Sequence, residues 1–198
     1  MKKLESTFIN MLISLTLVAL VASVSLAYMN ELTIGPKEAA RKLKKLNAIK
    51  SVLPDITNDP FTEKMSFAVE GEKDSLDFYP GKNEAGMAGV AISTYTNKGY
   101  SGLIRLMVGF NMEGNIHNIA VLEQKETPGL GTKITTESYV AQYLGKNPGT
   151  YKMTPTKDGG EVNAITGATI TTRAFNDAVQ RAYDSFEKEK NQFNTEAQ

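Results

Sequence analysis

The longest apolar run of the chain lies near its N-terminus. Residues 8–28 are almost entirely apolar, interrupted only by Asn10 and by small hydroxyl residues. About 20 apolar residues suffice for a helix to cross the hydrocarbon core of a bilayer. Lys2 and Lys3 precede the run, which favours a cytoplasmic start. We therefore predict that residues 1–34 form an N-terminal membrane anchor with one transmembrane helix.

Two other interpretations of this run stay open. Ser25-Leu26-Ala27 resembles the small-x-small cleavage site of a signal peptide, although the run is longer than a usual signal core. Five basic residues that follow oppose translocation and would keep the next domain inside the cell. They are Lys37, Arg41, Lys42, Lys44 and Lys45. Because long domains cross largely regardless of charge, we favour a retained anchor in the inner membrane, with the soluble part on the extracytoplasmic (periplasmic) side.

Helical spacing resumes after the break that Gly35-Pro36 predicts. Pro36 suits the first position of a new helix. Apolar residues then recur at helical spacing, with Lys and Arg on the other face, and Pro54 ends the pattern. Residues 35–60 are thus predicted to be a juxtamembrane helix and linker. Its basic face is interpreted as solvated, with contact to anionic membrane lipid as the alternative.

The pattern changes to a period of two further along the chain. Residues 89–96, 102–110 and 115–123 are rich in β-branched and aromatic residues, and turn residues separate them at 97–99 and 111–114. This spacing predicts an antiparallel meander. Polar residues 55–86, which include two prolines, predict irregular structure with one short strand near 65–69.

Helical patterns return in the C-terminal half. After a loop at 124–135, Thr136 is predicted to cap a short helix through Leu144, and residues 151–160 are turn-like. The last helix is predicted from about 170 to 187, with a buried stripe formed by Phe175, Ala178, Val179, Ala182 and Phe186. We expect a domain at 61–190 and a frayed tail at 191–198. The fold class is α+β, an antiparallel sheet packed with helices.

The amino-acid composition argues against several kinds of binding and catalytic site. Lys and Arg total 22, as do Asp and Glu, so no overall charge favours nucleic acid. The absence of cysteine excludes disulfides, Cys-ligated zinc, iron–sulfur clusters and thiol catalysis. The single histidine, His117, supports neither a metal site nor a Ser-His relay. No Gly-x-Gly-x-x-Gly follows a strand, so no NAD site is evident. We assign no catalytic residue and no metal.

The segment before the last helix carries the clearest chemical signal. Thr166-Gly167-Ala168-Thr169 is followed at once by further threonines, including Thr172. The free N–H groups and the dipole of a helix start favour an anion such as a phosphate. One Thr in this place would usually be an N-cap, but a cap needs one oxygen rather than a cluster. The segment is therefore a candidate phosphate site.

This motif, the apolar span and the loop Glu126-Thr127-Pro128-Gly129-Leu130-Gly131 together resemble one family over essentially the whole chain. They resemble the G subunit of the Rnf complex, the ion-translocating ferredoxin:NAD oxidoreductase, and less closely the C subunit of the sodium-pumping NADH:quinone oxidoreductase. The resemblance implies an electron-transfer flavoprotein that works with other membrane subunits and has little activity alone. It also implies a covalent FMN, attached by a flavin transferase that uses FAD.

The resemblance assigns the cofactor to particular residues. Thr169 would carry the phosphoester. Within the same motif, Gly167 lets a nucleotide approach the backbone, while Thr166 and Thr172 offer hydroxyl hydrogen bonds. The predicted cofactor-binding set is Thr166, Gly167, Ala168, Thr169, Thr172, Glu126, Thr127, Gly129, Leu130 and Gly131. One position departs from the family, because Asn163 stands where Asp is usual.

The loop and the aromatic residues each have two interpretations. Gly129 and Gly131 are ordinary turn residues, or they let backbone amides approach the flavin ring. Four aromatic side chains could stack on that ring, although aromatics in a sheet are more often core: Tyr95, Tyr100, Phe110 and Tyr139. The alternative function is an extracytoplasmic FMN-binding-like binding or sensory module without a redox role.

Overall fold

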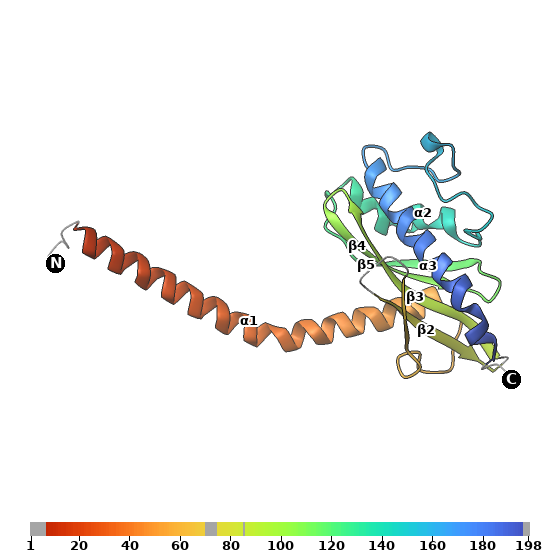
Figure 1. Ribbon diagram of the computed structural model, residues 1–198, viewed down its shortest axis with the longest axis horizontal. Coiled ribbons are helices and arrows are strands. Elements are labelled where there is room, and N and C mark those ends of the chain that lie inside the picture. The colour runs from red at the N-terminus through yellow and green to blue at the C-terminus, as the bar shows by residue number, and fades with distance from the viewer. Residues whose placement is uncertain (1–6, 70–74, 85, 196–198) are drawn as a thin grey trace. The chain divides into compact units, whose positions relative to one another are not determined.

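The structure is a computed structural model, and it describes residues 7–69, 75–84 and 86–195. The chain divides into two compact units, Met1–Leu43 and Lys44–Gln198. The elements, which Figure 1 draws along the chain, are α1 (Phe8–Val52), β1 (Met65–Ala68), β2 (Ser75–Asn83), β3 (Gly86–Gly99), β4 (Gly102–Phe110), β5 (Ile116–Glu123), the short 3-10 helices η1 (Gly131–Thr135), η2 (Ala141–Tyr143) and η3 (Thr156–Asp158), α2 (Glu137–Val140) and α3 (Thr169–Thr195).

From Phe8 onward, the N-terminal unit is helical. The most apolar stretch of α1 has a mean hydropathy of 2.2 and no buried residue, so by length and composition this helix can cross a membrane. Hydroxyl groups inside the apolar run donate to carbonyls of the preceding turn, as Thr16 Oγ1 does to Leu12 O at 2.8 Å and Ser23 Oγ to Ala19 O at 2.7 Å. Such internal bonds are what a lipid environment demands of a polar group.

The predicted break at Gly35-Pro36 is wrong. Helix α1 continues through Pro36 to Val52 as one element. Proline removes one N–H donor and crowds the carbonyl four residues before it. Once helix has formed on both sides, however, adding a residue is favourable, so one missing bond does not end the element.

The last turns of α1 belong to the folded domain, which therefore begins earlier than the predicted residue 61. Ile49 and Val52 are fully buried in a small apolar cluster that covers one face of the sheet. Lys44 Nζ donates to the carbonyl of Leu122, and Lys45 Nζ pairs with Asp77 Oδ2 at 3.2 Å. These two lysines of the basic run thus bond to the sheet instead of forming a purely solvated face.

The sheet is a five-stranded antiparallel meander in the order β1-β2-β3-β4-β5. The predicted strands at 102–110 and 115–123 are confirmed to within a residue. The predicted turn at 97–99 is wrong, because β3 continues to Gly99, which pairs with Gly102. The hairpin turn is instead made by Tyr100 and Ser101.

Strand β2 was not predicted from the sequence, because Pro80 is unfavourable inside a strand. Its register with β3 pairs Pro80 with Val90, whereas β1 pairs only with residues 75–78. At Pro80 the other edge of the strand faces a loop, and Asn58 Nδ2 donates to Pro80 O at 3.0 Å. Proline is tolerated in a strand where no neighbouring strand needs its N–H. The prediction of irregular structure for this region is therefore only partly correct.

Helix α3 packs across the opposite face of the sheet (Figure 1). The predicted stripe is confirmed, with all five of its side chains at 0 % exposure. The helix extends to Thr195, beyond the predicted end, because Phe193 is fully buried and stacks on Phe78 with ring centroids 5.9 Å apart. The predicted helix from Thr136 to Leu144 is reduced to one α-helical turn followed by a 3-10 turn.

Candidate functional site

A cavity of about 510 Å³ lies at the N-terminal end of α3. Four separate segments line it. They are the β3–β4 turn with Tyr100, the loop after β5 with Glu126, Thr127, Leu130 and Gly131, the 3-10 helix η3 with Lys157, and residues 167–171 at the start of α3. The two sequence motifs, far apart along the chain, therefore form the walls of one cavity.

Thr169 is the first residue of α3 and is half-buried. Lys157 Nζ donates to Thr169 Oγ1 at 3.3 Å. The turn before the helix requires glycine, because Gly167 has φ +79° in the left-handed region. A Cβ on Gly167 would also lie 3.3 Å from Leu130 Cδ2, so the two motifs touch at this point.

The threonines of the motif divide between two tasks. Thr172 is fully buried; its Oγ1 accepts from Ile165 N and donates to Ala168 O, each at 3.2 Å. Thr172 thus closes the turn and does not line the cavity. Thr166 is exposed and lines a neighbouring hollow of about 320 Å³ together with Asn163. Of the motif's hydroxyls, those of Thr169 and Thr171 belong to the cavity-lining residues.

Asn163, the position that departs from the family, is exposed. Its backbone N–H donates to Gln142 Oε1 at 2.8 Å, and Gln142 Nε2 donates back to Asn163 O at 3.4 Å. The main chain here is held by Gln142 whichever side chain stands at 163. These two hydrogen bonds do not involve the Asn163 side chain.

Glu126 connects three of the segments that surround the cavity. Its side chain is only 4 % exposed. One carboxylate oxygen accepts from Ser101 N at 2.9 Å and the other from Thr171 Oγ1 at 2.5 Å. Glu126 thereby ties the β3–β4 turn and the loop after β5 to the first turn of α3.

The two loop glycines are required for different reasons. A Cβ on Gly131 would lie 2.7 Å from Glu126 Cβ and 2.8 Å from its Oε2, so Gly131 makes room for Glu126. Gly129 has open space around it but a φ of +76°, which a side chain rarely adopts. Neither glycine needs a bound ligand to explain it, and their predicted contact with a flavin remains a prediction.

Apolar side chains gather around the same cavity. Among the described residues after Leu43, the large hydrophobic side chains that are exposed are Tyr100, Leu130, Leu144 and Ile170. All of these except Leu144 line the cavity. Tyr100 is 69 % exposed at the tip of the β3–β4 turn, so its ring is free to contact a ligand in the cavity.

Of the four aromatic residues considered for stacking, Tyr100 alone lines the cavity. The core interpretation is confirmed for Tyr95, Phe110 and Tyr139, which are at most 7 % exposed. Tyr95 lies under the guanidinium of Arg181, 5.1 Å from the ring centroid. Tyr139 bonds through its hydroxyl to that of Tyr143 at 2.9 Å, and burial raises the pKa of Tyr139 to about 12.

The residues of the cavity fit FMN. Ligand cavities usually measure about 300–1,000 Å³ and combine an apolar lining with a few polar groups. Here a lysine and a helix start, which suit a phosphate, lie at Thr169, and exposed apolar side chains that suit a planar ring surround them. Sequence reasoning missed Lys157, because nothing in its turn-like segment indicates that it faces the motif.

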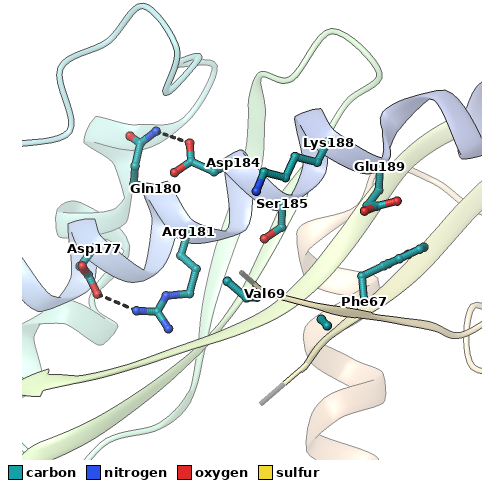
Figure 2. A pocket seen from close by; sticks show the side chains of 10 residues that line it. Phe67, Val69, Asp177, Gln180, Arg181, Asp184, Ser185, Lys188 and Glu189 are labelled. Atoms are coloured by element: carbon teal, nitrogen blue, oxygen red, sulfur yellow. Dashed lines mark hydrogen bonds and ion pairs between the residues drawn. The ribbon is translucent and has the colours of Figure 1, made fainter. Parts of the chain in front are cut away.

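Figure 2 shows a second hollow, of about 410 Å³, between α3 and the β1 segment. Four of the side chains that line it interact in two pairs. Asp177 Oδ2 lies 3.4 Å from Arg181 Nη2, and Gln180 donates to Asp184 at 2.9 Å. No predicted site residue lies there. In the part of the chain that the structure describes, no group of three or more His, Cys, Asp and Glu could hold a metal ion.

Known proteins similar to this chain decide its family. Residues 99–184, which include every part of the cavity, match the model of the FMN-binding domain. The G subunit of the ion-translocating oxidoreductase complex of Aliivibrio fischeri is 31% identical over 183 residues, covering 87% of this chain and 86% of the relative. The chain belongs to the family of these G subunits.

Other relatives agree with this assignment. The G subunit of the Na(+)-translocating ferredoxin:NAD(+) oxidoreductase complex of Acetobacterium woodii is 29% identical over 184 residues, which cover 87% of this chain and 88% of the relative. The crystal structure of Shewanella oneidensis NqrC has a TM-score of 0.50 at 19% identity, and the match covers 69% of this chain and 74% of that one. At this identity NqrC supports the fold alone.

Proposed function

We propose that this chain is the electron-transfer subunit of a membrane-bound, ion-translocating ferredoxin:NAD oxidoreductase (Rnf) complex, and that it carries FMN as a phosphoester on Thr169. One observation carries the proposal. Thr169, which is half-buried, lies at a helix start beside Lys157, in a cavity whose lining also includes the exposed apolar side chains of Tyr100, Leu130 and Ile170. Membership of the G-subunit family supports the same function.

The two ends of the cavity suit the two ends of FMN. A phosphodiester keeps one negative charge, which Lys157 and the N-terminus of α3 would stabilise. Tyr100, Leu130 and Ile170 would bury the faces of the ring. Bound FMN supplies reversible electron transfer, while the protein sets its position and surroundings.

The atoms of the new bond come from Thr169 and from FAD. Thr169 Oγ1 forms a bond to the phosphorus on the flavin side of FAD, the pyrophosphate bond breaks, AMP leaves and the hydroxyl proton is released. A flavin transferase would perform this step. The tether would then prevent loss of the cofactor on the extracytoplasmic side, where free FMN is scarce and where we place the soluble domain.

The decisive experiment compares Thr169→Ala with Thr169→Ser in native membranes that contain the transferase. Because serine retains the attacking hydroxyl, T169S should remain fluorescent under ultraviolet light in a denaturing gel, whereas T169A should lose the signal. A fluorescent T169A band, or a wild-type band without flavin, would refute the ester assignment.

The same variant separates electron transfer from the alternative, a binding or sensory module without a redox role. T169A should assemble with its partner subunits yet abolish ferredoxin-dependent NAD reduction by the membranes. Undiminished activity would favour the alternative.

A separate experiment tests the topology. Digestion of the soluble domain by protease added to sealed inside-out vesicles would contradict the proposed topology, since it would place the domain on the cytoplasmic side.

A further inference from the structure

Lys157 stands beside the hydroxyl that would carry the flavin, although it lies outside both sequence motifs. Its Nζ is 3.3 Å from Thr169 Oγ1, and the side chain is otherwise exposed. An isolated surface lysine gains little from one hydroxyl contact. The same position would gain more from a phosphate on Thr169, because a charged acceptor makes a stronger hydrogen bond with an ammonium group.

The backbone next to Lys157 is held by two contacts. The neighbouring Asp158 carboxylate accepts from Arg173 Nε and Nη2, each at 2.8 Å. Arg173 lies one helical turn after Thr169 on α3, so this bidentate pair ties η3 to the same turn of helix. The hydrogen bond from Arg173 lowers the pKa of Asp158, so the pair stays ionised at neutral pH.

The second contact lies one residue further along the chain, at Gly159. Lys152 Nζ donates to Gly159 O at 2.7 Å, and Gly159 ends η3 with φ +76°. Lys157 thus sits on a short loop held at Asp158 and at Gly159. The fold therefore holds the backbone from which the Lys157 side chain reaches Thr169.

The placement of charges in the cavity leaves Lys157 as the cation beside Thr169. The charged residues among the cavity's described lining are Lys157 and Glu126. The Glu126 carboxylate faces Ser101 and Thr171, which occupy one oxygen each. Lys157 is therefore the cation available to a charge that forms on Thr169.

We propose that Lys157 binds the phosphate of the FMN esterified to Thr169 and speeds formation of that ester. The inference rests on the proposed function. During attachment the new oxygen–phosphorus bond forms at Thr169 Oγ1 while AMP leaves from FAD. An ammonium group at this place attracts the flavin-side phosphate and stabilises its charge throughout the step. Lys157 acts as a cofactor-binding residue and exchanges no proton.

The test uses the full-length chain in detergent, with purified flavin transferase and FAD. We compare the initial rates of flavinylation of wild type, Lys157→Gln, Lys157→Arg and, as the matched control, Lys133→Gln. Lys133 is an exposed lysine that lines the neighbouring hollow instead of the cavity. K157Q should be slower by about five-fold, as expected for the loss of one exposed ion pair. K157R and K133Q should stay within about two-fold of wild type by the same reasoning.

A second measurement reports on the phosphate itself. The 31P resonance of fully flavinylated K157Q should be displaced from that of wild type, while K133Q should keep the wild-type position. Thermal unfolding of each variant checks that the fold is kept. The rate difference should shrink at high salt, since mobile ions screen an exposed pair.

The outcomes separate this inference from the proposal beneath it. A wild-type rate together with a wild-type 31P resonance in K157Q would overturn the role of Lys157 while leaving the ester on Thr169 intact. Equal slowing in K157Q and K133Q would also overturn it, because it would indicate general attraction to the transferase. A wild-type chain that acquires no flavin would refute the proposed function instead.

Discussion

The hydrogen bonds of Glu126 predict a large effect of Glu126→Ala on stability. The substitution removes the acceptor of the Thr171 hydroxyl, which is 1 % exposed, and of the Ser101 N–H. A hydrogen bond to a charged acceptor contributes about 1.5–3 kcal/mol, and leaving a buried donor unsatisfied costs a similar amount. Water can replace the acceptor at Ser101, which lies in an exposed turn. We therefore expect E126A to lower the free energy of unfolding by about 2–4 kcal/mol.

The assay is thermal unfolding of the full-length chain in detergent, followed by circular dichroism. For a domain of this size, 1 kcal/mol corresponds to about 2–4 °C in Tm, so E126A should melt roughly 4–16 °C below wild type. Glu126→Gln preserves the volume and one acceptor oxygen, so about half of the loss is expected. Glu137→Ala, at an exposed position in α2, should change the free energy by about 0.5 kcal/mol or less.

The same substitution should also affect the site. Thr171 lies one residue beyond Ile170 and two beyond Thr169, so releasing it from Glu126 loosens the first turn of α3. The extent of flavinylation should fall in E126A and remain normal in E137A. An unfolding free energy of E126A within about 0.5 kcal/mol of wild type, the range of ordinary surface substitutions, would refute the reasoning.

Two further predictions follow from the same contacts. Gly131→Ala should destabilise the domain by about 1–3 kcal/mol, because the added Cβ would clash with Glu126. Gly129→Ala has free space around it and should destabilise the domain by about 1–2 kcal/mol through backbone strain alone. Urea unfolding measures the free energy of unfolding of both variants. Burial tends to raise the pKa of Asp177, but hydrogen bonds from Lys98 and a buried threonine outweigh it and lower the pKa. The ionised carboxylate therefore stabilises the fold above the unfolded-state pKa of about 3.9, and this stabilisation is lost as pH falls through the lower pKa of the folded state. Wild type should be more stable than Asp177→Asn at pH 7 and should lose that advantage in acid.

The sequence by itself determined the elements whose patterns are local and uninterrupted. The apolar run of α1 reaches spanning length without help from the rest of the chain. Strands β4 and β5 are rich in β-branched and aromatic residues between clear turn residues, and α3 shows its buried stripe at helical spacing. The motif at 166–169 and the loop at 126–131 were also legible, since their residue types are tied to particular backbone and anion chemistry.

Other features were decided by partners distant along the chain. Strand β2 contains Pro80 and still forms, because β1 does not pair with it there. The side chain of Asn58, which lies in a loop, donates to the Pro80 carbonyl instead. Pro36 does not end α1, because the helix on both sides outweighs one lost hydrogen bond. In both cases proline does lack the N–H donor, but the helix or strand continues through it.

The site shows the same division in its chemistry. The sequence indicated hydroxyls near a helix start, but the tertiary structure alone turned Thr172 inward to close the turn and left Thr169 facing the cavity. It made Glu126 a buried tie between three segments and brought Lys157 to the Thr169 hydroxyl. Periodicity reports which face of an element is buried, whereas the direction of a side chain in a loop depends on what the rest of the fold packs against it.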